Sequence, residues 1–408
     1  MIHQKAAGGL QVQPATVDTR PQPARVLKVL HVTGSLHRGG VETWLRHALV
    51  RLPRDRYQCD VCTYQFSGGA YAADLERYGC RLHFIPRGSG PRALLRFSRE
   101  FRRLLRESPY DVVHCHGLLL VGFLLCLAWL ERVPVRIGHS HNTDRKTGSV
   151  LAMAVNRIGL ALNRPLARAF STHGVGCSAE AEAALFGSRW REKPKYTIIH
   201  CGIDLVPFEA DSHPDSWREA VGIPPRAKVL GHVSNLSVAK NPLFLVEAAA
   251  AVFHRRQDAV LLLVGDGALR LSIAQKCAEL GISSRVIFAG VSSHVPELMR
   301  SAMDVFVMPS VHEGLPLVLL EAQAAGLPCL VSDSVSREAS VVDGAIDFLP
   351  LASGPEAWGS AILSRLETSA QRPNSLAALK DTDFNVAVSA RRLAALYDAA
   401  CASRSGVA

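Results

Sequence analysis

The chain has 408 residues, 48% hydrophobic and 20% charged, so it can fill two domains of ordinary size and is not disordered overall. Its formal net charge of +10 is uneven, because residues 1–210 carry 29 Lys and Arg against 16 Asp and Glu, whereas the remainder carries 17 against 20. No nucleic-acid partner is expected, since aromatic residues are sparse and no recognition motif is present.

The first half of the chain alternates segments typical of strands and helices. Residues 1–24 are rich in Gln, Pro and Thr, lack the apolar stretch of a signal peptide, and are expected to form a disordered tail. Residues 25–205 are expected to form an N-terminal domain. Continuous apolar runs, typical of parallel strands buried on both faces, occur at 26–34, 57–66, 81–86, 111–117, 136–141, 174–179 and 197–204.

Two helical segments of this half bear on membrane contact. Residues 117–130 form the longest apolar stretch, but fourteen residues are too few to cross a bilayer, so a buried helix is expected. Residues 92–107 repeat apolar residues roughly at helical spacing, with arginines between them. Such a helix could lie on an anionic membrane surface, and the alternative is an ordinary solvated helix face.

The second half repeats the alternation after a break. Residues 206–226 are polar and contain prolines, which is typical of a linker. A C-terminal domain is expected at 227–375, with strand patterns at 229–235, 259–267, 286–291, 305–310, 328–333 and 346–351, followed by a helix and tail at 376–408. The sequence therefore predicts an α/β protein of two Rossmann-like, doubly wound parallel-sheet domains, whose strand carboxyl ends face a central cleft.

The spacing of the ten cysteines gives little indication of a metal site or a redox motif. Only Cys59 and Cys62 have the C-x-x-C spacing, and they lie inside a strand pattern rather than before a helix. No second pair completes a zinc site. The cysteines are therefore expected to be buried, reduced thiols, which suits the cytoplasm.

The stretch SVHEGLPLVLLEA, residues 310–322, places two glutamates eight positions apart. Pro316 is well placed to open a helix whose free N–H groups carry a partial positive charge, so a phosphate could bind at Gly314 and Leu315. Glu313 would then stand at the mouth of the cleft, and Glu321 would point back over the helix start, where it could accept hydrogen bonds from a ribose diol. The alternative is two ordinary helix glutamates.

With its surroundings, this stretch resembles the retaining glycosyltransferases of the GT-B fold, in the group 1, family 4 class that uses nucleotide sugars. The resemblance extends from about residue 26 to 400 and includes LLLVGDG, FAGV, DVFVMPS and AAGLPCLVSD. GHVSNLSVAKNPLFLVEAA and RIGHSHNT are most similar to enzymes of exopolysaccharide, capsule and O-antigen assembly. The fold so implied has a C-terminal helix that returns to the first domain.

The resemblance also implies roles for individual residues. Glu313 would contact the donor sugar, Glu321 the nucleotide ribose, and Lys240 the donor diphosphate; His141 would lie at the donor sugar or the reaction centre. Together, His141, Lys240 and Glu313 are the expected catalytic residues. The expected donor side is completed by Gly39 and Gly40 of a Gly-Gly-x-Glu loop, the turn at Gly265 and Asp266, Val291, Gly314 and Leu315.

One position departs from the family pattern. An arginine usually precedes the diphosphate lysine by five or six residues, but Asn235 occupies that place here. Asparagine can donate a hydrogen bond to a phosphate oxygen but adds no positive charge. The expected consequence is either reduced donor affinity or activity, or substitution by another arginine, for which Arg38 beside the Gly-Gly pair is one candidate.

Four histidines follow two adjacent strand patterns, in DVVHCHG and GHSHNT. His116 and His139 are assigned to the acceptor side of the cleft, beside His141. Histidines at this spacing could instead hold zinc. No metal site is expected, because no cysteine or carboxylate completes a ligand set and no D-x-D motif of metal-dependent transferases is present.

The resemblance implies transfer of a sugar from a nucleoside-diphosphate sugar, of UDP or GDP, to a glycan or lipid-linked glycan. The expected setting is surface polysaccharide synthesis in the cytoplasm, with peripheral contact to the membrane. The expected chemistry retains the anomeric configuration and needs no obligatory cofactor. Two alternatives stay open: a nucleotide-sugar 2-epimerase of the same architecture, and a catalytically weak sugar-nucleotide-binding protein, which Asn235 would explain.

Overall fold

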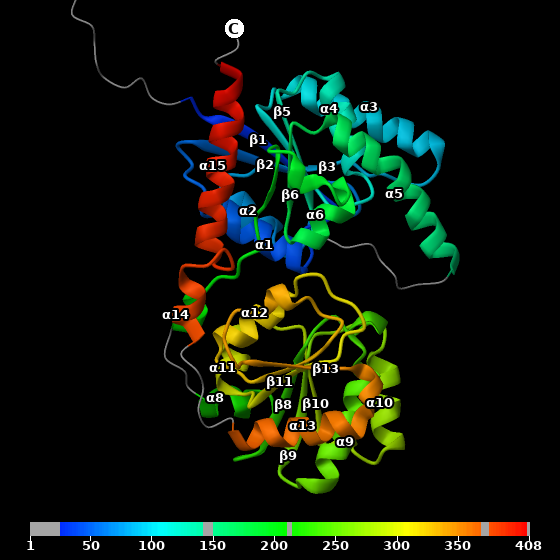
Figure 1. Ribbon diagram of the computed structural model, residues 1–408, viewed down its shortest axis with the longest axis vertical. Helices are drawn as coiled ribbons and strands as arrows, with labels where there is room; N and C mark the ends of the chain where they lie inside the picture. Colours follow the sequence, from blue (N-terminus) through cyan, green and yellow to red (C-terminus); the bar gives the residue numbers. More distant parts are fainter. Residues whose placement is uncertain (1–24, 142–149, 210–213, 369–374, 406–408) are drawn as a thin grey trace, which may run out of the picture.

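The computed structural model describes residues 25–141, 150–209, 214–368 and 375–405. The tail predicted at residues 1–24 lies outside them. The chain forms two α/β domains, which Figure 1 shows one above the other. Each domain is built on one parallel sheet, so the predicted fold class is confirmed.

The first domain contains a seven-stranded parallel sheet. Its central strands are almost wholly buried, because helices cover both faces, and this explains their continuous apolar sequences. Six of its helices follow successive strands: α1 (Gly40–Leu49), α2 (Ala72–Arg77), α3 (Pro91–Glu107), α4 (Val121–Leu130), α5 (Val150–Phe170) and α6 (Ala179–Phe186). The strand order is β3 (Leu82–Phe84), β2 (Tyr57–Thr63), β1 (Leu27–Thr33), β4 (Val112–His116), β5 (Val135–Ser140), β6 (His173–Gly176) and β7 (Tyr196–Ile198).

The apolar segment 117–130 contains α4, most of which is buried against the sheet, as predicted. Among the described residues, no helix is both long enough and apolar enough to cross a bilayer.

The basic segment 92–107 coincides with α3, and its apolar residues are partly buried in the core and partly exposed to solvent. Phe97, Phe101 and Leu105 are buried in the core of the first domain, whereas Leu94 and Leu95 are exposed. The amphipathic pattern is therefore explained largely by core packing, and only the start of the helix presents apolar side chains to solvent.

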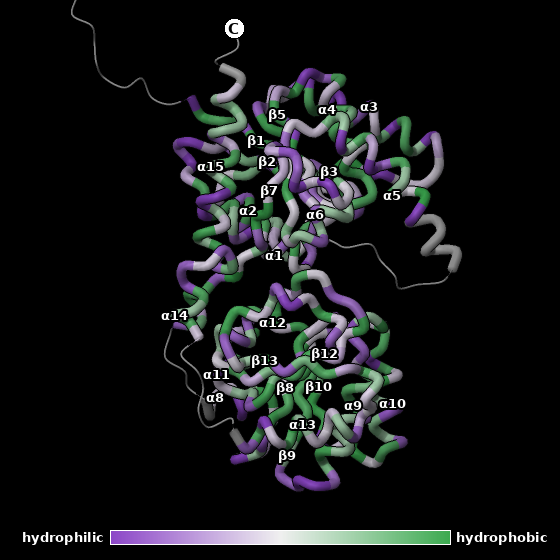
Figure 2. Tube along the Cα trace, in the orientation of Figure 1, coloured by the Kyte–Doolittle hydropathy of each residue, from purple (hydrophilic) through white to green (hydrophobic). Residues whose placement is uncertain are grey.

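The second domain contains a six-stranded parallel sheet, and Figure 2 shows its hydrophobic strands at the centre of the domain. The strand order is β10 (Val286–Gly290), β9 (Ala259–Val264), β8 (Lys228–Val233), β11 (Val305–Met308), β12 (Cys329–Ser332) and β13 (Ile346–Leu349). The main helices are α9 (Pro242–Arg255), α10 (Arg270–Glu279), α11 (Val295–Ser301), α12 (Leu317–Ala324) and α13 (Gly354–Thr368). In the linker, α7 (Val206–Glu209) and α8 (Pro214–Ala220) contact α11.

The last helices lead the chain back to the first domain, as predicted. After α14 (Ser375–Lys380), the long helix α15 (Val386–Ser405) lies beside the first domain in Figure 1. Its buried residues join the core that contains α1, and Trp44 Nε1 donates a hydrogen bond to Ser389 Oγ at 3.2 Å. The C-terminal helix is thus part of the first domain's core although the chain reaches it last.

Candidate active site

A cavity of about 930 Å³ lies between the two domains. Residues from the carboxyl ends of strands in both sheets line it, which is where doubly wound sheets place their ligand loops. The helices α1 and α12 meet across it, since a Cβ added to Gly40 would lie 3.8 Å from the side chain of Leu317. The predicted central cleft is therefore present.

The loop before α12 forms one wall of this cavity. Glu313, Gly314 and Leu315 line it, and Pro316 is the N-cap residue, with an extended backbone that turns the chain into the helix. The helix start therefore presents free N–H groups beside the cavity. An anion would be stabilised there by the partial positive charge of α12.

Glu321 lies one turn into α12 and also lines the cavity, as predicted. Burial raises the pKa of its carboxyl group to about 7. Polar hydrogens donated by a ligand in the cavity would offset the cost of burying this carboxylate.

Lys240 reaches the same wall from the loop after β8. A short 3-10 turn, Val238–Lys240, is followed by Asn241 in the left-handed conformation with φ 53°, and Pro242 then begins α9. The ammonium group of Lys240 forms an ion pair with Glu313, and both side chains are largely buried. The sequence predicted both residues for the site, and the structure brings them into direct contact.

Asn235 and the Gly265–Asp266 turn line the neighbouring part of the cavity. Gly265 has φ 121°, and a Cβ there would lie 1.9 Å from the Ser234 carbonyl oxygen. Only glycine therefore allows these two loops to approach so closely. Val291, also predicted for the donor side, lines the cavity with 64% of its surface exposed.

The first domain contributes Gly39 and Gly40 to the opposite wall, as expected. Next to them, Arg38 crosses between the domains and donates a hydrogen bond from Nη1 to the Ser292 carbonyl oxygen at 2.7 Å. This places a guanidinium group on the cavity lining. The position agrees with the hypothesis that Arg38 substitutes for the missing family arginine.

His141 lines the cavity at the end of β5, but both of its ring nitrogens are engaged within the protein. Nε2 lies 2.9 Å from His116 Nδ1, and Nδ1 lies 3.3 Å from Cys201 Sγ. Cys177 is next to this pair, and hydrogen bonds from Cys201 and His141 lower the pKa of its thiol to about 5. Sequence reasoning missed both cysteines, because no local spacing links them to His141.

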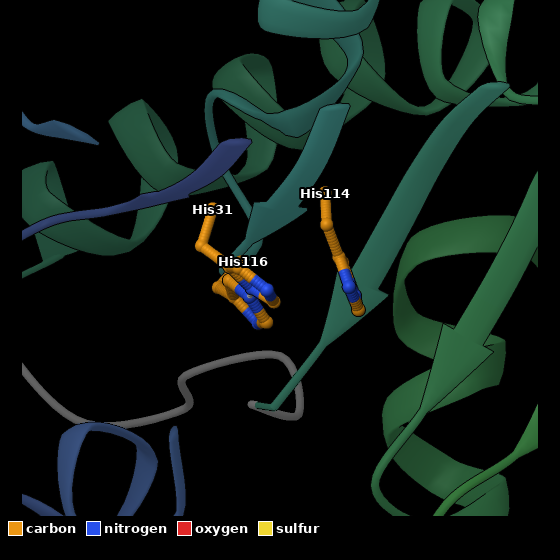
Figure 3. A group of neighbouring side chains, drawn as sticks. All are labelled: His31, His114 and His116. Carbon is orange, nitrogen blue, oxygen red and sulfur yellow. Dashed lines mark hydrogen bonds between the residues drawn. The ribbon is translucent and has the colours of Figure 1, made fainter. Parts of the chain in front are cut away.

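Behind His141 the first domain contains a buried histidine cluster. Figure 3 shows His31, His114 and His116 extending from β1 and β4 toward the same side of the sheet. Their rings and that of Tyr397 form a continuous hydrogen-bonded chain that starts at His141 and passes through His116, His31, Tyr397 and His114 to His139.

Two sequence-based expectations about these histidines need correction. His116 and His139 are 2% and 0% exposed and do not line the cavity, so the structure does not place them on the acceptor side of the cleft. They lie behind His141, because alternate residues of a strand share one face. The argument that no cysteine completes a metal-ligand set is also wrong, since Cys177 and Cys201 lie beside His141.

Two parallel-sheet domains with a ligand cavity between their strand ends are the architecture of the GT-B fold. The family model described as Glycosyltransferase Family 4 matches residues 38–206, and the model described as Glycosyl transferases group 1 matches residues 227–368. The chain belongs to this family of glycosyltransferases and is therefore an enzyme.

Individual relatives agree with this assignment. The chain is 36% identical over 337 residues to the protein named "Putative glycosyltransferase EpsF" of Bacillus subtilis (strain 168), covering 82% of this chain and 86% of the relative. It is 28% identical to an Escherichia coli UDP-Gal:alpha-D-GlcNAc-diphosphoundecaprenol alpha-1,3-galactosyltransferase, over 57% of this chain and 60% of that one. The crystal structure of Anabaena Alr3699/HepE with UDP-glucose superimposes with a TM-score of 0.74 at 20% identity, over 91% of this chain and 100% of that one.

Proposed function

We propose that the protein transfers a sugar from a nucleoside-diphosphate sugar held in the cavity between the domains. The observation that carries this proposal is the ion pair of Lys240 and Glu313 at the start of α12, with Glu321 one turn further on. The ammonium group and the helix start would bind the diphosphate, Glu313 the sugar, and Glu321 the ribose hydroxyls. Arg38 would add a second positive charge that Asn235 does not supply.

We propose UDP as the nucleotide of the donor. The E. coli relative is named for a UDP-sugar, and Alr3699/HepE was crystallised with UDP and with UDP-glucose. The test is thermal denaturation with a panel of UDP- and GDP-sugars, since a ligand that binds only the native state raises its stability. A shift with GDP-sugars alone would contradict the choice of UDP.

The assignment of Glu321 to the ribose has its own test. Glu321→Ala removes a charged acceptor, so UDP should bind about 1–3 kcal/mol more weakly by calorimetry. Exposed Glu338, in the same domain, provides the control variant Glu338→Ala, for which no change is expected. Unchanged UDP affinity in Glu321→Ala would remove Glu321 from the donor site.

We propose that transfer retains the anomeric configuration. As the resemblance to retaining glycosyltransferases implies, the acceptor hydroxyl would attack from the face that the diphosphate leaves. Lys240 and the start of α12 would stabilise the charge that develops on the leaving diphosphate. Nuclear magnetic resonance of the first product formed tests this, because an inverted anomer would exclude the mechanism.

The proposed acceptor is a glycan or lipid-linked glycan of surface polysaccharide synthesis, at the cytoplasmic face of the membrane. The name of the E. coli relative, which includes a diphosphoundecaprenol-linked sugar, and the similarity to EpsF support this acceptor class. Incubation with UDP-sugar and either a lipid-linked or a free sugar acceptor would distinguish the cases. Donor binding without transfer to any acceptor would instead support a sugar-nucleotide-binding protein of weak activity.

A further inference from the structure

Three side chains on the first-domain wall of the cavity have the composition of a metal-ligand set. His141 follows β5, Cys177 follows β6 and Cys201 follows β7, so three adjacent strand ends bring them together. One ligand atom from each lies within 4.8 Å of the others, and His141 Nδ1 is 3.3 Å from Cys201 Sγ. They are 7%, 3% and 5% exposed, and all three line the cavity.

We propose that His141, Cys177 and Cys201 bind one thiophilic metal ion, with Zn²⁺ as the first candidate. Zinc prefers nitrogen and sulfur ligands in tetrahedral geometry, and sites with three protein ligands keep a fourth position open. Because all three residues line the cavity, water or an oxygen atom of a ligand could reach a fourth position from it. This inference does not depend on the proposed function.

The charge of the surroundings suits a cation at this place. Two thiolates and a neutral imidazole balance the charge of Zn²⁺, so a buried site carries no net charge. Glu182 lies close enough to Cys177 to interact with it electrostatically. It is fully buried, and neither carboxyl oxygen has a hydrogen-bond partner in the described part of the chain. A metal ion held by the two thiolates would remove the uncompensated negative charge of Cys177 beside this buried carboxyl group.

The histidine behind the site supports the ligand orientation. His141 Nε2 is 2.9 Å from His116 Nδ1, which leaves Nδ1 directed at Cys201. When Nδ1 binds a metal, Nε2 carries the proton and donates it in the hydrogen bond to His116. Metal-bound histidines almost always have such a partner, which fixes the ring and its tautomer.

The ligand atoms of a second group, His116, His139 and His141, also lie within 4.8 Å of one another, but this group is less suitable as a metal site. His116 and His139 are at most 2% exposed and do not line the cavity, so an ion would have no direct path to them. Both ring nitrogens of His116 are already in hydrogen bonds with other histidines. The group with two cysteines is open to the cavity and contains the softer ligands.

The test uses the full chain, reduced and then freed of reductant and metal, and titrates it with Co²⁺ and then Zn²⁺. We expect one equivalent of Co²⁺ to give sulfur-to-cobalt charge-transfer absorption, which Zn²⁺ removes, with release of thiol protons. The double variant Cys177→Ser with Cys201→Ser should lose this absorption. The control Cys126→Ser, which changes a partly exposed cysteine on α4, should keep it.

Two outcomes would overturn the proposal. One is the lack of stoichiometric charge-transfer absorption in the unmodified protein, and the other is unchanged metal binding by the folded double variant, which would place the ion on the histidine group. If the double variant does not fold, zinc-edge X-ray absorption of the unmodified protein decides the question. Two sulfur ligands are expected, and a shell of nitrogen and oxygen alone would contradict the site.

Discussion

Glu321 should make the free energy of unfolding depend on pH when no nucleotide is bound. Burial raises the pKa of its carboxyl group from 4.5 to about 7, so between these pH values the native state holds a proton that the unfolded chain has lost. Stability should therefore fall as pH rises through this range. Glu321→Gln cannot ionise, and it should gain about 1–3 kcal/mol relative to the parent protein at pH 8 compared with pH 5.

Urea denaturation of both proteins without nucleotide, at pH 5 and pH 8, measures this difference. Glu338→Gln is the matched control, because it also replaces one glutamate of the second domain but at an exposed position. If Glu321→Gln and the parent protein lose equal stability between the two pH values, Glu321 is ionised already in the native protein at pH 5.

Lys240 should matter for turnover rather than for folding. Lys240→Ala removes the ammonium group that pairs with Glu313 in the cavity, so the leaving diphosphate would lose its nearest positive charge. A loss of one such group costs about 10²-fold or more in kcat. Lys276→Ala is the control, since Lys276 pairs with Glu247 on the surface of the same domain. Parental turnover in Lys240→Ala would show that the diphosphate is bound elsewhere.

At the scale of elements, α15 completes the hydrogen bonds of the histidine cluster. Tyr397 Oη lies 2.8 Å from His114 Nδ1 and 3.3 Å from His31 Nε2, and all three residues are fully buried. Tyr397→Phe would leave two ring nitrogens without this partner, so unfolding should require about 1–3 kcal/mol less free energy. Tyr57→Phe, which loses partly buried hydrogen bonds to Asp398 and to the Ala394 carbonyl oxygen on the same helix, should cost less, because water can replace these partners. Equal losses in denaturant titrations would contradict this.

The elements also show where sequence reasoning succeeds and where it stops. The thirteen strands of the described residues all overlap strand patterns predicted from the sequence. The central strands are the clearest case, because a parallel strand buried on both faces is a continuous apolar run. Local motifs also predicted that Glu313, Lys240 and Gly39 line the cavity between the domains. The contact between His141 and Cys201 could not be predicted, because 60 residues separate them and only the sheet order brings their strand ends together.

The spacing of apolar residues in α3 also could not predict what its apolar face packs against. An amphipathic helix has the same spacing whether its apolar face packs on a sheet or on lipid. In the structure, Phe97 and Phe101 pack in the core, and carboxylates neutralise part of the basic face: Arg102 and Arg106 pair with Glu131 of the loop after α4. Local sequence predicts the helix, but tertiary structure decides what covers it.

At the scale of the whole molecule, the excess positive charge of the first domain favours binding to an anionic membrane surface. Arg92 and Arg99 are exposed, have no ion pair with a described residue, and flank the exposed Leu94 and Leu95 at the start of α3. Each basic residue near an anionic surface contributes about 1 kcal/mol, and this attraction falls off within a Debye length. We therefore expect the protein to bind anionic vesicles at low salt and to be released at high salt.

Co-sedimentation with anionic and with neutral vesicles, at two ionic strengths, measures this binding. The double variant Arg92→Glu with Arg99→Glu should bind anionic vesicles at least tenfold more weakly, because two attractive charges become repulsive. Arg337→Glu with Lys380→Glu makes the same change of charge at exposed positions of the second domain and α14, and should bind like the parent protein. Equal weakening by both variants would show that net charge alone, and not the start of α3, directs the contact. If the parent protein ignores anionic vesicles at low salt, a soluble acceptor becomes the better hypothesis.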